Sequence, residues 1–539
     1  MYGRRVGAQV EVAQGAREEV RTAEVIATLC LATDLGMGFP FEHGLEGTVV
    51  AMRLADELGI TGEDASQTYY AMLLTHSGCT TDAQLAAEIF GSDLRESFHP
   101  VLYGSPRQVV FGLIGSIPDP DASLPARALQ TARGFPKLAR NQRPHLTATC
   151  EVGEMLAARL GLSPATAGLF AFLTERWDGK GPLRRAGAEE VPLPIRVMHV
   201  ARDAVFQGRR GGPEFVAEVI GERAGGAFDP EIANCLASKA PELLAIDPDR
   251  STWEEVLAAE PAPAATLVGP EIDRALAAFG DFADLISPHL TGHSARVAEL
   301  AADAAARLGL DAGEVEGVRR AGHLHDIGRV GVHPAIWSKP GPLTADEWEQ
   351  VRLHPYHTER VLSRSPFFAG LAPIASADHE RLDGSGYHRG ASAPALAPGA
   401  RLLAAADAYV AMTSPRPHRL ALSTERAADE LAAEASSGRL DPEAAMAVLE
   451  QAGEPVPPIE RPAGLTEREV QVLALLARGL QTKQVARALE ISVKTADRHV
   501  QNAYAKVGVS TRAAATLYAM EHGLVAWGEF PIEAAPPRA

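Results

Sequence analysis

Two stretches of this 539-residue chain carry the same motifs in the same order, which constrains the fold more than any other feature. In the first stretch His43 is followed 33 residues later by His76, and in the second His293 is followed 32 residues later by His325. Further on, ERWDGKG parallels ERLDGSG, and an arginine follows each of these glutamates after 21 residues. Repeated spacings of this kind are typical of internal repeats. The sequence therefore predicts a diverged duplication of one domain.

The segments inside each copy have the apolar periodicity of helices. Apolar residues recur at three- and four-residue steps, as in VAELAADAAARL, whereas alternating runs of β-branched residues are scarce. Proline-rich stretches at 260–266 and 454–462 disfavour both helix and strand and are typical of linkers. The sequence thus predicts an all-α protein with three domains, at 1–260, 270–453 and 463–528.

Composition restricts the partners of these domains. The net charge of −18 disfavours a chain-wide nucleic-acid or membrane surface. Residues 464–528 differ, because eight lysines and arginines there outnumber five acids, which leaves −21 on the rest of the chain. The four cysteines form no CxxC pair, and neither a signal peptide nor an 18-residue apolar run is present. These features predict a cytoplasmic protein without membrane contact, whose DNA contacts would be confined to residues 464–528.

Histidines gather in the second copy. Ten of the seventeen lie between His289 and His418, including the adjacent pair His325-Asp326. A single buried histidine is more often a core residue than a ligand, but a cluster with neighbouring carboxylates suits a divalent ion. Imidazole and carboxylate together favour iron, manganese or zinc over calcium.

Residues 275–450 resemble the HD-GYP branch of the HD phosphohydrolases. The resemblance rests on motifs in the family's order: GHSARV (292–297), HDIG (325–328), KPGPLT (339–344), HP (354–355), DHERLDGSGY (378–387), ADAY (406–409) and RPHR (416–419). It implies tandem HD-type helical domains, two or three bound metal ions, and often hydrolysis of cyclic di-GMP.

The resemblance also implies roles for individual residues. One ion would be held by His293, His325, Asp326 and Asp407, and the second by Asp326, His354, Asp378 and His379. A hydroxide shared by two cations can attack phosphorus while the cations neutralise the phosphate oxygens. We therefore expect two divalent ions, iron or manganese before zinc, with Asp326 bridging them. Arg329 would face a phosphate, and Glu380 would orient His379 or a water.

Three positions depart from the family's pattern. Asp378 replaces a usual histidine, Arg329 a usual lysine, and His388 a usual proline. Asp378 can still bind a metal, while Arg329 keeps the charge with a bidentate fork. The departure at His388 leaves the substrate open among cyclic di-GMP, a mononucleotide and another phosphoester.

The first copy has lost the corresponding ligands. Ser77 follows His76 where Asp326 follows His325, and Arg202 stands where Asp407 stands. Thr174 and Glu175 likewise replace the paired ligands. A cation in a ligand position repels a metal, so the first copy is predicted to be metal-free, with a structural or ligand-sensing role.

Residues 465–524 resemble the LuxR-type C-terminal DNA-binding domain. Capping signals predict helices at 467–478, 482–489 and 492–507 and a fourth from Ser510. The second and third would form a helix-turn-helix whose third helix enters the major groove. Three exposed residues would read bases and four would hold phosphates. The base readers are Asp497, Arg498 and Gln501, and the phosphate contacts are Lys483, Lys494, Thr495 and Lys506. Such modules generally bind paired half-sites, so a homodimer is expected.

These features together predict a transcriptional regulator. Its central metal-dependent phosphohydrolase or phosphodiesterase domain would bind or hydrolyse a nucleotide or phosphodiester and thereby control binding to double-stranded DNA. Two alternatives remain open. The protein could be primarily an enzyme that the helix-turn-helix only localises, or a non-catalytic sensor that uses the HD fold.

Overall fold

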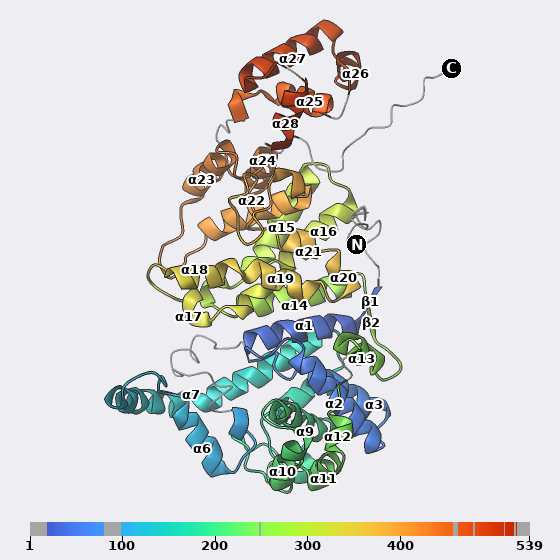
Figure 1. Ribbon diagram of the computed structural model, residues 1–539, viewed down its shortest axis with the longest axis vertical. Coiled ribbons are helices and arrows are strands. Elements are labelled where there is room, and N and C mark those ends of the chain that lie inside the picture. Colours follow the sequence, from blue (N-terminus) through green and yellow to red (C-terminus); the bar gives the residue numbers. More distant parts are fainter. Residues whose placement is uncertain are drawn as a thin grey trace, which may run out of the picture.

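The computed structural model describes residues 19–79, 99–246, 249–455, 462–477, 480–510, 512–521 and 524. The regular secondary structure of these residues is almost entirely helical, and their two named strands form one small sheet, so the all-α prediction is confirmed. Figure 1 shows a tall stack with the first copy at the bottom, the second in the middle and the C-terminal helices at the top. No described helix has the length and apolarity needed to cross a bilayer.

The first copy is a helical bundle in which α2 packs against α3 and α9. Its elements are β1 (Glu19–Arg21), α1 (Thr22–Gly36), α2 (His43–Glu57), α3 (Gly62–Leu73), η1 (His99–Val101), α6 (Pro106–Gly115), α7 (Leu124–Arg159), α8 (Pro164–Gly168), η2 (Leu169–Phe172), η3 (Ala188–Glu190), α9 (Leu193–Gly208), α10 (Pro213–Arg223), α11 (Pro230–Ser238), α12 (Ala240–Leu243) and α13 (Thr252–Ala258).

The second copy is centred on α15, which packs against α14, α16, α22 and α24. The buried face of α15 consists largely of alanines, and such small side chains let neighbouring helices approach closely. The elements are β2 (Thr266–Val268), α14 (Pro270–Asp284), η4 (Pro288–Leu290), α15 (His293–Arg307), α16 (Ala312–Leu324), η5 (Ile327–Gly331), α17 (Pro334–Trp337), α18 (Ala345–Arg352), α19 (His354–Leu362), α20 (Pro366–Ala369), α21 (Ala372–Ala375), η6 (Ala393–Ala395), α22 (Pro398–Met412), α23 (Thr424–Ser436) and α24 (Pro442–Gln451).

The two copies repeat the same helix start. His43 begins α2 and His293 begins α15, and each follows a residue in the left-handed region, Glu42 at φ 76° and Gly292 at φ 71°. This conformation favours glycine, so it is strained at Glu42. The first copy nevertheless has the same backbone conformation as the second at this position. The repeated backbone supports the duplication that the spacing predicts.

Both copies also contain the same arginine–aspartate ion pair. Arg196 Nη1 lies 2.6 Å from Asp229 Oδ2, and Arg401 Nη1 lies 3.0 Å from Asp441 Oδ2. Each aspartate also caps the helix that follows it, α11 in the first copy and α24 in the second. The arginines are those that follow the two glutamates after 21 residues, so this spacing corresponds to a shared structural contact.

Helix α1 joins the copies. It packs against η5 and α19 of the second copy, and β1 pairs antiparallel with β2 beside it (Figure 1). The buried Glu24 carboxylate of α1 accepts hydrogen bonds from the Ser365 hydroxyl and from the Phe367 N–H. One hydrophobic core runs through both copies. The two copies are therefore packed against each other around a shared core and are not merely tethered.

The C-terminal helices form their own small cores. Thr466 and Glu469 make the predicted reciprocal capping bonds, Ser492 caps the third helix, and Gly508 ends that helix at φ 71°. The predicted end of the first helix at 478–479 lies outside the described residues, as do residues 1–18 and 525–539. The elements are η7 (Pro462–Gly464), α25 (Glu467–Ala477), α26 (Thr482–Ala488), α27 (Val493–Val507) and α28 (Arg512–Glu521).

Candidate metal centre and DNA-binding helix

Three helices of the second copy bring a first group of predicted ligands together. His293 begins α15, His325 directly follows α16, and Asp407 lies within α22. All three are buried, and one nitrogen or oxygen atom from each lies within 4.8 Å of the others. His293 Nε2 is 3.1 Å from Asp407 Oδ1. Residues more than 110 positions apart in sequence thus converge on one point.

A second group lies beside the first. It combines Asp326, His354, Asp378 and His379, again with one ligand atom from each within 4.8 Å. His354 begins α19, while Asp378 and His379 lie in the loop after α21. Asp378, which stands where the family usually has a histidine, therefore lies with the other three residues predicted to hold the second ion.

Asp326 faces both groups. Its Oδ2 lies 3.0 Å from His325 Nε2 and 3.3 Å from His293 Nε2, whereas its Oδ1 lies 3.5 Å from His354 Nε2. A carboxylate with one oxygen toward each set is arranged as a bridging ligand requires.

Backbone carbonyls orient two of the imidazoles. His325 Nδ1 is 2.7 Å from the Gly322 carbonyl oxygen, and His354 Nδ1 is 2.6 Å from the Val351 carbonyl oxygen. In a neutral ring this contact places the proton on Nδ1, which leaves the Nε2 lone pair facing the centre. Burial lowers the pKa of His354 to about 4 and holds the pKa of His379 well below its usual range. Both rings are consequently neutral at pH 7, the state that metal ligation needs.

The centre contains an unusual number of buried polar atoms without a hydrogen bond. A buried polar group of this kind is costly unless it is satisfied. Nitrogen and oxygen donors in such a set fit iron, manganese or zinc. The atoms are both ring nitrogens of His293, Nε2 of His325, His354 and His379, both carboxylate oxygens of Asp326 and Asp378, and Oδ1 of Asp407.

Arg329 forms an ion pair with the same carboxylate, without the geometry of a hydrogen bond. Its Nη1 lies 2.5 Å from Asp326 Oδ2, and its side chain is 5% exposed. The guanidinium lies over the Trp337 indole at 5.3 Å, and Trp337 Nε1–H donates to the Arg329 carbonyl. The predicted phosphate-binding cation therefore competes, in this structure, for a predicted metal ligand.

Glu380 makes its hydrogen bonds to the loop that follows it. Its two carboxylate oxygens accept from the backbone N–H groups of Arg389 (3.2 Å) and Ala391 (2.8 Å), and no hydrogen bond joins it to His379. Both oxygens therefore hold the following loop, and the orientation of His379 or a water by Glu380 stays a prediction.

Three residues around the centre were not predicted as site residues. The Asp284 carboxylate accepts from the Ser294 N–H and hydroxyl, which fixes the start of α15 beside His293. Thr358 donates to the His325 carbonyl and accepts from the Gly328 N–H, and so ties α19 to the HDIG segment. The Tyr387 ring stacks on His379 at 4.4 Å. A signal for Asp284 did exist, because an aspartate precedes the histidine by nine residues in both copies.

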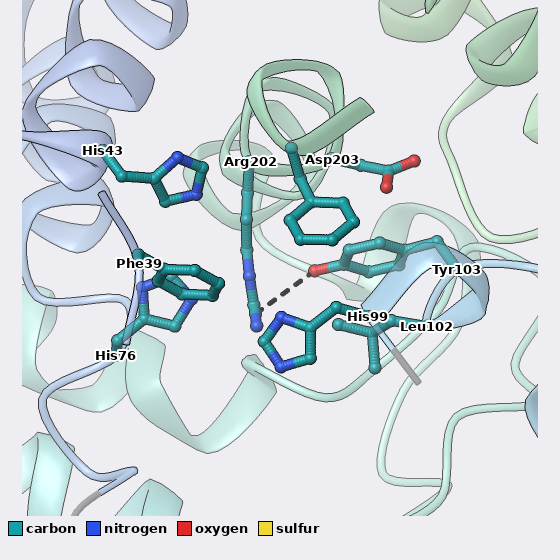
Figure 2. A pocket seen from close by; sticks show the side chains of 9 residues that line it. Phe39, His43, His76, His99, Leu102, Tyr103, Arg202 and Asp203 are labelled. Carbon is teal, nitrogen blue, oxygen red and sulfur yellow. Dashed lines mark hydrogen bonds between the residues drawn. The ribbon is translucent and has the colours of Figure 1, made fainter. Parts of the chain in front are cut away.

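The corresponding place in the first copy has different chemistry. Among the described residues, groups able to hold a metal are found only in the second copy. In the first copy, the Arg202 side chain lies between Phe39 and His76 on one side and His99 and Tyr103 on the other (Figure 2).

Helix α27 presents most of the predicted DNA contacts to solvent. Lys494, Thr495, Asp497, Arg498 and Gln501 are exposed, whereas Val500 and Ala503 on the opposite face are buried. Lys483 is exposed on α26. Figure 1 places α27 at the far end of the stack from the first copy. The face of α27 that would enter a major groove is therefore exposed to solvent.

Lys506, predicted to contact a phosphate, makes an ion pair within the domain. Its ammonium lies 2.7 Å from Glu469 Oε2 and donates to the Gly464 carbonyl at 2.8 Å. Glu469 is nearly fully buried, so this ion pair holds the end of α27 against the start of α25. The positive charge is already matched within the domain.

Comparison with known proteins agrees with this architecture. The family described as "HD domain" matches residues 278–444, and "Bacterial regulatory proteins, luxR family" matches residues 463–519. The 3'3'-cGAMP-specific phosphodiesterase 3 of Vibrio cholerae is 30% identical over 413 residues, which are 75% of this chain and 89% of that protein. A cyclic di-GMP phosphodiesterase of Thermotoga maritima is 38% identical over 29% of this chain and 43% of its own length.

A solved structure shares the tandem fold. The crystal structure of a cyclic GMP-AMP specific phosphodiesterase from V. cholerae matches with a TM-score of 0.55 and 25% identity, over 81% of this chain and 98% of that one. The fold of the second copy is that of an HD domain. This chain belongs to the HD-GYP-type phosphodiesterase family and also carries a LuxR-type domain, which confirms both resemblances.

Proposed function

We propose that this protein is a metal-dependent phosphodiesterase whose nucleotide substrate controls an attached DNA-binding module. One observation carries the proposal. Seven histidine and aspartate side chains, six of them buried and His379 partly buried, converge with unsatisfied ligand atoms in the same chain as the exposed helix α27. The alternative is an enzyme that its DNA-binding module only localises. It differs from our proposal only in lacking coupling between the metal domain and that module.

The two groups divide the proposed ligands. His293, His325, Asp326 and Asp407 would hold one cation, and Asp326, His354, Asp378 and His379 a second. Cations in such a site supply a hydroxide at neutral pH and offset charge on the phosphate oxygens. The chain itself contributes imidazoles, two of which (His325 and His354) are oriented by backbone carbonyls, and burial that strengthens electrostatic contacts with the substrate.

The proposed substrate is a cyclic dinucleotide, because the relatives are named for cyclic di-GMP and 3'3'-cGAMP. His388 belongs to neither ligand group, so the departure at this position leaves both proposed ligand sets intact. Elemental analysis combined with assays of cyclic di-GMP, 3'3'-cGAMP, cyclic di-AMP and cyclic mononucleotides tests the proposal. We expect two metal equivalents and turnover of a cyclic dinucleotide; metal-loaded protein that turns over none of them is a sensor.

The contact between Arg329 and Asp326 favours the sensor as a second candidate, because the guanidinium occupies a ligand oxygen. We expect Arg329→Lys, which restores the family's usual residue, to bind metal more tightly and to hydrolyse substrate at least as fast. Lysine lacks the fork and the stacking on Trp337 that hold the arginine in place. Calorimetric metal titration and phosphodiesterase rates measure both effects, with Arg319→Lys on α16 as the matched control. Loss of metal from Arg329→Lys would mean that the guanidinium supports the site.

The proposed DNA contacts follow from exposure on α27. Arg498, Asp497 and Gln501 would read base edges, while Lys483, Lys494 and Thr495 would contact phosphates. Lys506 is left out because of its ion pair with Glu469. We propose that the protein binds paired half-sites as a homodimer.

A physical route for coupling supports the regulator over the localised enzyme. Helix α28 of the DNA-binding module contacts η6 of the second copy. The loop leading to η6 is held by Glu380, the neighbour of His379, through the Ala391 N–H. Arg401 then donates to the Ala393 carbonyl within η6 at 2.8 Å. Movement of the loop beside the metal ligands would therefore reach the DNA-binding module.

A further inference from the structure

The first copy contains a pocket where its metal ligands have been lost. The empty space is about 250 Å³, including space open to solvent. Figure 2 shows the Arg202 side chain extending through it, flanked by rings. The pocket is lined by Phe39, His43, His76, His99, Leu102, Tyr103, Arg202, Asp203 and Phe206.

Arg202 brings a positive charge that no described carboxylate matches. Among the described residues it makes no ion pair, and its hydrogen bond to the Tyr103 hydroxyl is long, at 3.5 Å. The adjacent carboxylate of Asp203 is not available to it, because Arg223 forms an ion pair with that carboxylate and Gln207 donates to it. A partly buried cation without a counter-charge is costly, so an anion in this pocket would be favoured.

Two histidines add hydrogen-bond donors. His43 Nδ1 accepts from Arg209 Nε at 3.1 Å, so in the neutral ring the proton lies on Nε2. Burial, followed by the charge of Arg209, lowers the pKa of His43 to about 3 and keeps the ring neutral. His76 is 3% exposed, and its Nε2 has no hydrogen-bond partner. In the tautomer with its proton on Nε2, this buried nitrogen would donate to a ligand oxygen.

We propose that this pocket binds a phosphate group, with Arg202 as its charge partner and His43 and His76 as its hydrogen-bond donors. A guanidinium matches phosphate oxygens in a bidentate geometry. The pocket is narrow and is filled in part by the Arg202 side chain, so the proposed occupant is a single phosphate group, inorganic or at the end of a nucleotide, and not an entire cyclic dinucleotide. The site is independent of turnover in the second copy.

The test measures phosphate binding where the metal centre cannot contribute. Full-length protein carrying Asp326→Ala is titrated by calorimetry with inorganic phosphate and with guanosine 5'-monophosphate, and sodium chloride matches the ionic strength. We expect saturable binding to one site per chain in this background. Tighter binding of the nucleotide than of phosphate identifies a nucleotide as the occupant, and equal affinity identifies phosphate alone.

Arg202→Met, added to this background, is expected to weaken binding at least about tenfold, as loss of a charge-assisted contact does. Its thermal midpoint without phosphate should not fall, because an unmatched charge is replaced by an apolar chain of similar length. Arg202→Lys should retain part of the affinity. Arg210→Met is the matched control, since Arg210 lies over Phe215 and outside the pocket lining. Absence of saturable binding in the parent, or equal binding by parent and Arg202→Met, overturns the proposal.

Discussion

Asp326→Ala is expected to strip the second copy of its metal and to abolish phosphodiesterase activity. The carboxylate reaches His293 and His325 with one oxygen and His354 with the other, so no neighbouring ligand can replace it. Changes in residues that only support a metal ligand cost 10–100-fold. For a ligand shared by two ions we expect the rate to fall by more than about 1,000-fold. Elemental analysis and the phosphodiesterase assay measure the two losses.

Two controls separate this effect from general damage. Asp303→Ala changes an exposed aspartate of α15 and should leave metal content and rate unchanged. His76→Ala, in the first copy, should leave the metal content unchanged. Two ions still bound to Asp326→Ala would show that this residue is not the bridge.

Arg498→Ala is expected to cost on the order of 1–3 kcal/mol in operator binding and to relax the sequence preference. The side chain is exposed on α27, with the buried Val500 on the other face of the helix. An arginine at a groove-facing position can bind a guanine edge bidentately, and that contact is lost for the specific site alone. Electrophoretic mobility or fluorescence anisotropy with operator and random duplexes measures the change.

Lys494→Ala provides the contrast. A phosphate contact carries no sequence information, so its loss should weaken all duplexes similarly and reduce the salt slope by about one. If Arg498→Ala and Lys494→Ala both lost affinity equally for operator and random DNA, the placement of α27 in the groove would be wrong.

The repeats and motif spacings were sufficient to predict the fold class and the convergence of the proposed ligands. His293, His325 and Asp407 are carried by three helices whose order the motifs preserve, so their positions could be inferred by resemblance. Hydrogen-bond and ion-pair partners that depend on tertiary packing could not be inferred from the sequence. Glu380 bonds to amides nine and eleven residues ahead because of a local loop, and Lys506 meets Glu469 only when α27 packs on α25.

The partners of Arg202 and Arg329 could not be predicted from the sequence either. The sequence indicates that Arg202 replaces a ligand and that Arg329 replaces a lysine, but charge alone does not reveal a partner. The structure pairs Arg329 with Asp326 and leaves Arg202 in a pocket without an ion-pair partner among the described residues. One arginine therefore bears on metal binding, and the other on a separate anion site.

Coupling between the metal domain and the DNA-binding module is the central claim. Residues 454–462 join them and include four prolines, a semi-rigid spacer of roughly 28 Å at about 3.1 Å per residue. The charge of −21 outside the module repels DNA when it lies close to it. We therefore expect the isolated module, 463–539, to bind DNA at least as well as the full chain at low salt.

The most direct measurement is the operator affinity of the full chain with and without metal and cyclic dinucleotide, on an operator selected from random duplexes. The isolated module is titrated in parallel, so that effects of the additives on DNA itself are removed. We expect metal plus nucleotide to shift the affinity of the full chain by more than threefold and to leave the isolated module unchanged. If no combination of metal and nucleotide shifts the full chain by threefold, the domains are not coupled, and the protein is an enzyme that its helix-turn-helix only localises.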